Sequence, residues 1–442
     1  MRIPGHQGRS GLWRHRDFLL LWGGQSISEM GSAVTQLALP LAAVVVLRAS
    51  TFQVGLLSAA ATAAFLVVAL PAGAVVDRLA KRRLMLTCDF GRMLVIASVP
   101  VAAALGILGM PQLYVVALLA GLGTVFFDVA YQSYLPELVS REQLIDGNGK
   151  LQTSAEVARL AGPGLGGGLV GLVGAATAMT ADAASFAVSV ASLLAIRARP
   201  AARSVTAGPA GRPAARLRAE VTAGLAFVFR DPILRKVVAC TGTSNLFSSM
   251  TGALDIIFLV RILHVRPAYT GLLVAAGALG GVAGGATSGW LARRIGSARI
   301  IWVSILGFGA FGMLVPLATP GWGVALFVLG WGAVSFSAVV YNVAQVSYRQ
   351  AVCPPELLGR MNAAIRWIVW GTIPLGGVLG GAVGTALGVR AALVIALAGS
   401  FLGGLWVFFS PLRRMRDVPS PGSHPVAAGG LATPLPAPAP EG

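Results

Sequence analysis

The chain is 442 residues long, 56% of its residues are hydrophobic, and only 11% are charged. A soluble protein carries about 25% charged residues, so this composition excludes a soluble globular protein. The formal net charge of +18 does not indicate nucleic acid, because the basic residues are not interleaved with exposed aromatic residues on a soluble face. We therefore expect a membrane protein in contact with lipid, without a nucleic-acid partner.

Long apolar segments follow one another along the whole chain. A helix needs roughly 20 mostly apolar residues to cross a bilayer, and about twelve segments satisfy this length. The predicted spans are, in chain order, 18–46, 52–76, 84–107, 112–135, 150–173, 176–196, 234–260, 268–291, 297–318, 321–346, 361–387 and 390–411. The pattern predicts an all-α polytopic membrane protein.

Basic residues mark one side of these predicted spans. They gather at the amino terminus, in the even-numbered hairpins and in the carboxyl flank, whereas the opposite hairpins hold only Arg48, Arg261, Arg266 and Arg390. Positively charged loops stay in the cytoplasm, so we expect both termini there. Two termini on one side require an even number of spans, which agrees with twelve.

Several ionisable residues fall within the predicted spans, where they are costly and are functional candidates by default. Glu29 lies near the middle of the first span and has no obvious local partner. Glu156 and Arg159 are three residues apart in the fifth span and so share one helix face. An ion pair that only supports the fold is the alternative for these two residues. Other ionisable residues within the spans are Asp89, Arg92, Asp182, Asp255 and Arg366.

A short basic hairpin joins the second and third predicted spans. It reads Gly73-x-x-x-Asp77-Arg78-x-x-Lys81-Arg82, and a related hairpin from Gly285 to Arg294 returns about half a chain length later. The second copy has Gly289 in the position of the acid. The repeat predicts two duplicated halves, and such halves often bind substrate at their interface and move against each other.

Small residues gather in the fifth and eleventh predicted spans. Small side chains let helix backbones approach closely, and proline removes one helix hydrogen bond and favours a kink. We therefore expect helix packing at Gly162, Pro163, Gly166, Gly167, Gly380 and Gly381.

A polar segment rich in alanine, proline and glycine separates the two halves. It predicts a cytoplasmic linker over 197–230, whose end from Arg216 to Arg230 has the spacing of an amphipathic surface helix. The flanking parts are an amino-terminal six-helix bundle over 1–196 and a carboxyl-terminal six-helix bundle over 231–412. The tail over 413–442 has the composition of a disordered segment.

Three motifs resemble the major facilitator superfamily. The hairpin from Gly73 to Arg83 is similar to the signature between helices two and three, although Ala80 replaces a common glycine and Lys81 a usual arginine. The stretch from Phe126 to Asn148 resembles the branch of bacterial siderophore exporters and macrolide-type drug efflux proteins. The Gly162–Gly167 segment is similar to a signature associated with antiporters. The resemblance covers about residues 15–412.

The resemblance implies twelve transmembrane helices in two pseudo-symmetric six-helix bundles, in the cytoplasmic membrane of a bacterium. Since twelve spans form a complete unit, we expect a monomer. The hairpin is expected to act as a cytoplasmic gate when the halves rock, through Gly73, Asp77, Arg78, Lys81 and Arg82. The family pattern implies Asp128, low in helix four, as the partner of Lys81. Solvated charges that only set the topology are the alternative.

In a facilitator fold, helices one, four, seven and ten would line the substrate cavity. Glu29 is then the first candidate for proton coupling, with Glu156 and Arg159 second, because desolvation can keep a carboxylate protonated until it meets water or a cationic substrate. The polar residues on these helices are Gln25, Tyr131, Gln132, Asn245, Tyr341, Asn342 and Gln345. So few polar groups suit an amphipathic compound better than a sugar, whose buried hydroxyls need partners.

The function that follows is alternating-access export of a drug, siderophore or secondary metabolite, with a small-molecule substrate and protons as partners. A proton-coupled or facilitative importer of the same fold is the alternative, because the fold does not fix direction. A membrane enzyme or a sensor is disfavoured, since the four histidines are scattered outside the spans and the linker is too small for a signalling domain. No nucleotide, cofactor or metal motif is found in the sequence.

Overall fold

The computed structural model describes residues 12–76, 79–140, 143–197, 226–353 and 355–418. In the first half, long helices follow one another with short turns between them. They are α1 (Arg16–Leu41), α2 (Thr51–Val76), α3 (Lys81–Ala104), α4 (Met110–Leu138), α5 (Leu144–Val173) and α6 (Ala175–Ala195). Helix α1 continues directly into the π-helix η2 (Ala42–Val46). We call these helices the first bundle.

The second half repeats this arrangement with one span broken into pieces. Its long helices are α8 (Leu234–Ile257), which continues into the π-helix η4 (Phe258–Ile262), α9 (Pro267–Ile295), α12 (Val324–Val352), α13 (Pro355–Leu387) and α14 (Val389–Gly403), which leads into α15 (Leu405–Phe408). The broken span comprises α10 (Arg299–Val303), η5 (Ser304–Phe308), η6 (Gly309–Met313) and α11 (Leu314–Leu317). We call these helices the second bundle.

Unusual backbone features occur at matching places in the two bundles. A π-helix follows α1 and another follows α8. Just beyond them, Arg48 and His264 have positive φ angles of 50° and 54°. Gly174 between α5 and α6 and Gly388 between α13 and α14 have φ angles of 84° and 86°, which only glycine adopts without strain. These shared features show that the sequence repeat is a structural duplication.

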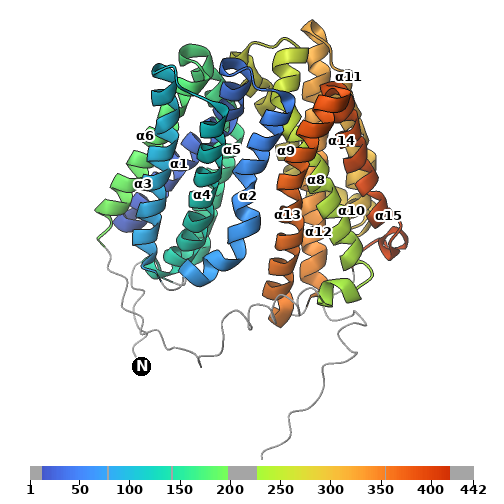
Figure 1. Ribbon diagram of the computed structural model, residues 1–442. Helices are drawn as coiled ribbons and strands as arrows, with labels where there is room; N and C mark the ends of the chain where they lie inside the picture. The colour runs from blue at the N-terminus through green and yellow to red at the C-terminus, as the bar shows by residue number, and fades with distance from the viewer. Residues whose placement is uncertain (1–11, 77–78, 141–142, 198–225, 354, 419–442) are drawn as a thin grey trace, which may run out of the picture.

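Within each bundle the helices pack side by side. In the first, α1 contacts α5 and α6, α3 contacts α4 and α6, and α2 contacts α4. In the second, α8 contacts α13 and α14, and α9 contacts α12. The bundles meet where α2 packs against α13 and α5 against α9 (Figure 1). The predicted all-α architecture of two six-helix bundles is confirmed.

Close contacts between the bundles lie at one end of the molecule. Near the start of α2, Gly55 faces Gly381 of α13. Gly167, near the end of α5, faces Gly271 at the start of α9. The Arg261 guanidinium donates from Nη2 to the Ala49 carbonyl at 2.6 Å. We call this the joined end. In Figure 1 it lies at the top, and α1 begins at the opposite end.

Ten helical stretches of the described residues are long and apolar enough to cross a membrane. They match ten of the predicted spans. The other two predicted spans correspond to α2, whose qualifying apolar stretch is the shorter Thr51–Leu66, and to α5. Two predicted spans were too short, because their helices begin before the apolar segment: α5 begins at Leu144 and α13 at Pro355. Polar residues extend these helices without contributing to the hydropathy signal.

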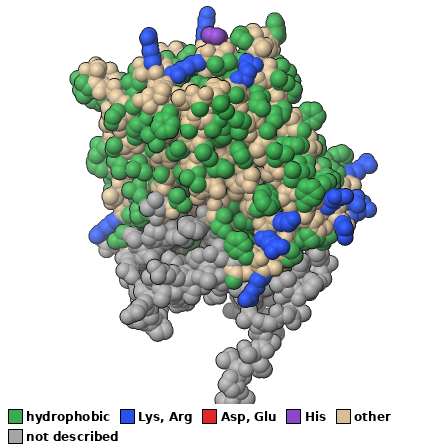
Figure 2. Space-filling model, turned by 45° about the vertical axis from the view of Figure 1, so that its right-hand side comes forward, with side chains coloured by type: hydrophobic (Ala, Val, Ile, Leu, Met, Phe, Trp, Pro, Cys, Tyr) green, Lys and Arg blue, Asp and Glu red, His purple; other side chains and the backbone are tan. Residues whose placement is uncertain are grey.

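The surface of the second bundle has a wide hydrophobic band between its two ends. Figure 2 shows hydrophobic side chains over the middle, with Lys and Arg side chains only toward the top and the bottom. A bilayer requires this distribution, because a charged side chain in hydrocarbon is costly. The band therefore fits the membrane and the two charged rims fit the aqueous interfaces.

The beginning of the carboxyl-terminal tail is ordered, which corrects the expectation of disorder from residue 413. Residues Pro411–Arg414 form the 3₁₀-helix η8. The Arg416 carbonyl accepts a hydrogen bond from the Ala298 backbone N–H at 3.0 Å, and Leu412 is fully buried. The buried leucine anchors the tail, a contact that composition does not reveal. The predicted surface helix at 216–230 falls outside the described residues except for 226–230.

Candidate functional site

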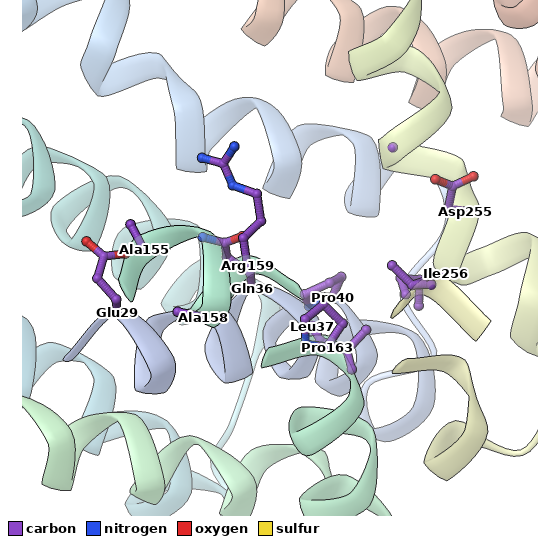
Figure 3. Close-up of a pocket in the computed structure, with 13 residues that line it drawn as sticks. Glu29, Gln36, Leu37, Pro40, Ala155, Ala158, Arg159, Pro163, Asp255 and Ile256 are labelled. Carbon is purple, nitrogen blue, oxygen red and sulfur yellow. The ribbon is translucent and has the colours of Figure 1, made fainter. Parts of the chain in front are cut away.

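A cavity of about 280 Å³ lies between the two bundles. Helices α1 and α5 line it from the first bundle, and α8 and α9 from the second. Its lining residues are Glu29, Ala33, Gln36, Leu37, Pro40, Ala155, Ala158, Arg159, Pro163, Gly252, Asp255, Ile256 and Val274. Most are apolar, and three are ionisable. Figure 3 shows Glu29 and Arg159 on one side and Asp255 on the opposite side.

Glu29 reaches the cavity from the middle of α1. Its Oε1 accepts a hydrogen bond from Gln25 Nε2 at 2.8 Å. The expectation that Glu29 has no local partner was therefore wrong, and the spacing of four residues on a helix was the signal for the pair. The bond accounts for Gln25, which was predicted to line the cavity and instead orients the carboxylate. Within the described part of the chain, Gln25 Oε1 has no hydrogen-bond partner.

Arg159 and Glu156 form a loose pair on α5. Arg159 Nη1 lies 3.8 Å from Glu156 Oε1, and both side chains are exposed. Gln152 Nε2 donates to the same Glu156 oxygen at 2.9 Å. Arg159 lines the cavity, whereas Glu156 does not. An exposed pair this long contributes little stability, so the Arg159 guanidinium stays available to a ligand.

Asp255 enters the cavity from late in α8. Its side chain is buried, and its Oδ1 has no hydrogen-bond donor among the described residues. The sequence showed this acid within a predicted span, but the predicted site did not include it. Only the packing of α8 against the first bundle brings it to the same cavity as Glu29.

The other predicted cavity residues lie elsewhere. The Tyr341 hydroxyl lies 2.7 Å from Thr241 Oγ1 and donates to the Val237 carbonyl at 3.2 Å, so it joins α12 to α8. Gln345 Nε2 donates to Asn342 Oδ1 at 2.9 Å. The Tyr341 bonds hold two helices together, whereas the Gln345 bond lies within α12. None of these three residues lines the cavity described above.

Two further members of that predicted set lie on α4, and one lies on α8. The ring of Tyr131 stacks on that of Phe127 at 6.1 Å between centroids, and Gln132 is exposed. Asn245 Nδ2 donates to the Val369 carbonyl at 3.3 Å, which links α8 to α13. None of the three lines the cavity between the bundles.

Lys81 binds a different acid from the one expected. Its Nζ lies 2.5 Å from Glu137 Oε1 and 3.2 Å from the Ser133 carbonyl. Asp128 precedes Glu137 by nine residues on α4, which places it about 13 Å further along the helix axis. Lys81, at the first position of α3, therefore meets the end of α4 and not its middle.

Arg82 caps the carboxyl end of α6. Its Nε donates to the Leu193 carbonyl at 2.8 Å and its Nη2 to the Leu194 carbonyl at 2.9 Å. These carbonyls belong to the last turn of α6, where a cation also favours the helix dipole. Of the other hairpin residues, Gly73 lies within α2, and Asp77 and Arg78 fall outside the described residues.

Asp89 and Arg92 form a buried ion pair inside the first bundle. The Ser189 hydroxyl of α6 donates to Asp89 Oδ2 at 2.6 Å. The Arg92 guanidinium lies between the rings of Phe127 and Phe186, at 4.7 and 4.3 Å from their centroids. Arg92 is thus the cation that offsets the buried acid of α3.

The glycines predicted to pack helices lie at close helix contacts. Within the bundles, Gly162 faces Ala33 of α1, Gly166 faces Val34 of α1, and Gly380 faces Met250 of α8. Between the bundles, a Cβ on Gly167 would lie 2.8 Å from the Ala268 carbonyl, and one on Gly381 would lie 3.0 Å from the Phe52 carbonyl. The Pro163 carbonyl touches the position that a Cβ on Gly271 would occupy.

Comparisons with known proteins agree with this architecture. Residues 11–435 match the model of a family described as "Transmembrane secretion effector". The chain is 26% identical over 400 residues to the "Multidrug efflux pump Tap" of Mycolicibacterium fortuitum, covering 87% of this chain and 93% of that protein. It is 25% identical over 362 residues to the "Enterobactin exporter EntS" of Citrobacter koseri, covering 79% and 80%.

Solved structures share the fold at low sequence identity. A bacterial homologue of the human lysosomal transporter Spinster, in an inward-facing and occupied conformation, superposes with a TM-score of 0.71 at 15% identity, covering 92% of this chain and 98% of that one. A bacterial homologue of the iron transporter ferroportin, in an inward-facing state, gives 0.71 at 16% identity, covering 90% and 99%.

Proposed function

This chain belongs to the transmembrane secretion effector family of the major facilitator superfamily, and we propose that it exports small amphipathic compounds in exchange for protons. The resemblance seen in the sequence is thereby confirmed: the protein is a multi-pass membrane transporter. The relatives named as a drug efflux pump and as a siderophore exporter support outward transport. The exchange for protons is our own proposal.

The cavity between the bundles is the observation that carries this proposal. Both bundles contribute to its wall, so a rocking motion would open it to alternate sides of the membrane. Its apolar lining suits the apolar part of an amphipathic compound, because each buried apolar surface is removed from water. Since one chain supplies both walls, we propose a monomer as the working unit.

Glu29 is our candidate for the proton-coupling group. It lies in the cavity wall on the first bundle, and Gln25 orients its carboxylate through one oxygen. A carboxylate in this position binds a proton or offers a negative charge to the cavity, but not both at once. Opening toward the side of higher proton concentration would load Glu29, and opening toward the other side would release the proton.

The proposed topology indicates which side of the membrane is closed in the present conformation. With both termini in the cytoplasm of a bacterium, the joined end faces outward, because α2 begins there and α13 ends there. Contacts such as Arg261 to the Ala49 carbonyl would then close the external side. The present conformation would correspond to a state that receives substrate from the cytoplasm, as an exporter requires.

Substitution of Glu29 tests the proton exchange. Purified Glu29→Gln protein in liposomes with an imposed proton gradient should lose gradient-driven transport of a compound that the native protein carries, while Asp146→Asn should keep it. Asp146 is the control because it is exposed and pairs with Lys150 on α5, away from the cavity. Unchanged gradient-driven transport in Glu29→Gln would remove Glu29 from the mechanism.

The direction of transport needs a separate measurement in cells. A panel of amphipathic compounds should accumulate less in cells that make the protein, and collapsing the proton gradient should restore accumulation. Higher accumulation in the producing cells would instead indicate an importer of the same fold.

A further inference from the structure

Asp255 differs from the other buried acids described in this chain. Asp89 has Arg92 and Ser189 as partners, and Asp182 accepts hydrogen bonds from Ser32 and Ser185. Asp255 is 6% exposed, and no hydrogen bond or ion pair within the described part of the chain involves its side chain. An isolated buried carboxylate is costly unless it is paired. Groups in such unfavourable surroundings are typical of functional sites, where a ligand can supply the missing partner.

The position of Asp255 indicates that an external partner of its carboxyl group would bind inside the cavity. It lines the cavity from α8 of the second bundle, opposite Glu29 and Arg159 (Figure 3). It lies two residues before the end of α8, near the joined end, whereas Glu29 is near the middle of α1. A compound entering from the other end would therefore meet Asp255 at the deepest point of the cavity.

The charges around the cavity favour a positively charged partner. Its ionisable wall residues are two acids, Glu29 and Asp255, and one base, Arg159. The base already lies near a third acid, Glu156. The other wall residues from the second bundle are Gly252, Ile256 and Val274, whose side chains offer no donor. The local chemistry thus combines one carboxyl group, which has no partner among the described residues, with apolar surroundings.

We propose that Asp255 binds the cationic group of the transported compound, so that amphipathic organic cations are the preferred substrates. This inference rests on the proposed export function and adds the substrate class. The cation supplies the charge that Asp255 lacks, and the apolar part of the compound packs against the wall formed by both bundles. A bound cation thereby links the second bundle, through Asp255, to the first bundle, through the apolar residues of α1 and α5.

Equilibrium binding tests the inference without requiring transport. Tetraphenylphosphonium is an amphipathic cation, and triphenylphosphine oxide keeps three of its phenyl rings without a net charge. Binding of each compound to the full chain in lipid nanodiscs is followed by tryptophan fluorescence. Asp255→Asn should weaken tetraphenylphosphonium binding by about tenfold or more and leave triphenylphosphine oxide binding unchanged. Asp255→Glu, which keeps the charge, should retain most of the cation binding.

Asp182→Asn is the matched control, because Asp182 is also a buried acid but lies on α6 among serine hydroxyls and outside the cavity. It should not change the preference for the cation. Equal losses for both compounds in Asp255→Asn, or unchanged cation binding, would overturn the inference. Absence of cation binding to the native protein would overturn it as well. A native protein that binds the cation but does not export it would contradict only the export function.

Discussion

At the scale of single residues, the buried acids Asp89 and Asp255 have different surroundings. Asp89 and Arg92 neutralise each other, and Ser189, Phe127 and Phe186 complete their environment. Asp255 has no such partner in the described residues. A buried pair costs little as long as both members are present, and removing one leaves an uncompensated charge. We therefore assign the Asp89–Arg92 pair to stability of the fold and Asp255 to the proposed binding of a ligand.

The Asp89–Arg92 pair gives a prediction for stability. Arg92→Leu should lower the free energy of unfolding by about 3–5 kcal/mol, because it leaves Asp89 buried without its cation. The double variant Asp89→Asn/Arg92→Leu should lose clearly less, since neither charge is left. Denaturant unfolding of the purified protein in micelles measures both. Equal losses in the single and double variants would show that packing of the arginine, and not charge, is what matters.

At the scale of elements, the ordered start of the tail connects α15 to the turn between α9 and α10. The Ser297 backbone N–H donates to Asp417 Oδ1 at 3.0 Å, and the Ser297 hydroxyl lies 3.2 Å from the same oxygen. The second basic hairpin, which has Gly289 where the first has Asp77, therefore receives an acid from the tail. This contact ties the carboxyl terminus to the second bundle.

The tail contact should depend on pH. The backbone N–H of Ser297 holds the pKa of the Asp417 carboxyl below its usual range. A lowered pKa in the folded state means that the contact is fully present above the ordinary carboxyl pKa and is lost as the pH falls through the lowered value. The protection factors of the backbone amides in residues 411–418, which are exchange rates corrected for the intrinsic effect of pH, should therefore be high at pH 7 and lower below about pH 4.

Asp417→Asn should speed the same exchange already at pH 7, and Asp146→Asn should not. Exchange in Asp417→Asn that matches the native protein at pH 7 would show that the Arg416 carbonyl, bonded to the Ala298 N–H, holds the tail without the carboxylate.

At the scale of the whole molecule, glycines set how closely the bundles meet at the joined end. Gly167 of α5 lies against Ala268 and Gly271 of α9, whereas an added Cβ on the neighbouring Gly168 would meet nothing within 4 Å. Gly55 and Gly381 repeat such a contact between α2 and α13. Two backbone-to-backbone contacts thus close one end of the cavity, and alternating access would require both to separate.

Gly167→Ala should hold the joined end apart, because its Cβ would press on the Ala268 carbonyl. Spin labels on α5 at Leu172 and on α9 at Tyr269, both exposed, report the separation in a background without the three native cysteines. The label distance should be longer in Gly167→Ala than in the native sequence, with slower transport. Gly168→Ala is the matched control and should change neither quantity. An unchanged distance in Gly167→Ala would mean that the helices adapt locally.

The sequence by itself determined the class of fold, the position of the spans and the side on which the basic residues lie. These properties follow from local apolar length and from charges near span ends, and each is read without knowing which helices are neighbours. The sequence also showed the duplication of the two halves, and the structure has matching π-helices after α1 and α8. Even the Gln25–Glu29 bond had a sequence signal in its spacing of four residues.

Only the tertiary structure decided which of these residues share a site. Lys81 pairs with Glu137 and not with Asp128, because the end of α4 lies beside the start of α3. Tyr341 joins α12 to α8 instead of lining the cavity. Asp255 meets the cavity of Glu29 because α8 and α1 belong to bundles that face each other. The partners of a buried polar group come from helices distant in sequence, and periodicity along one helix carries no information about them.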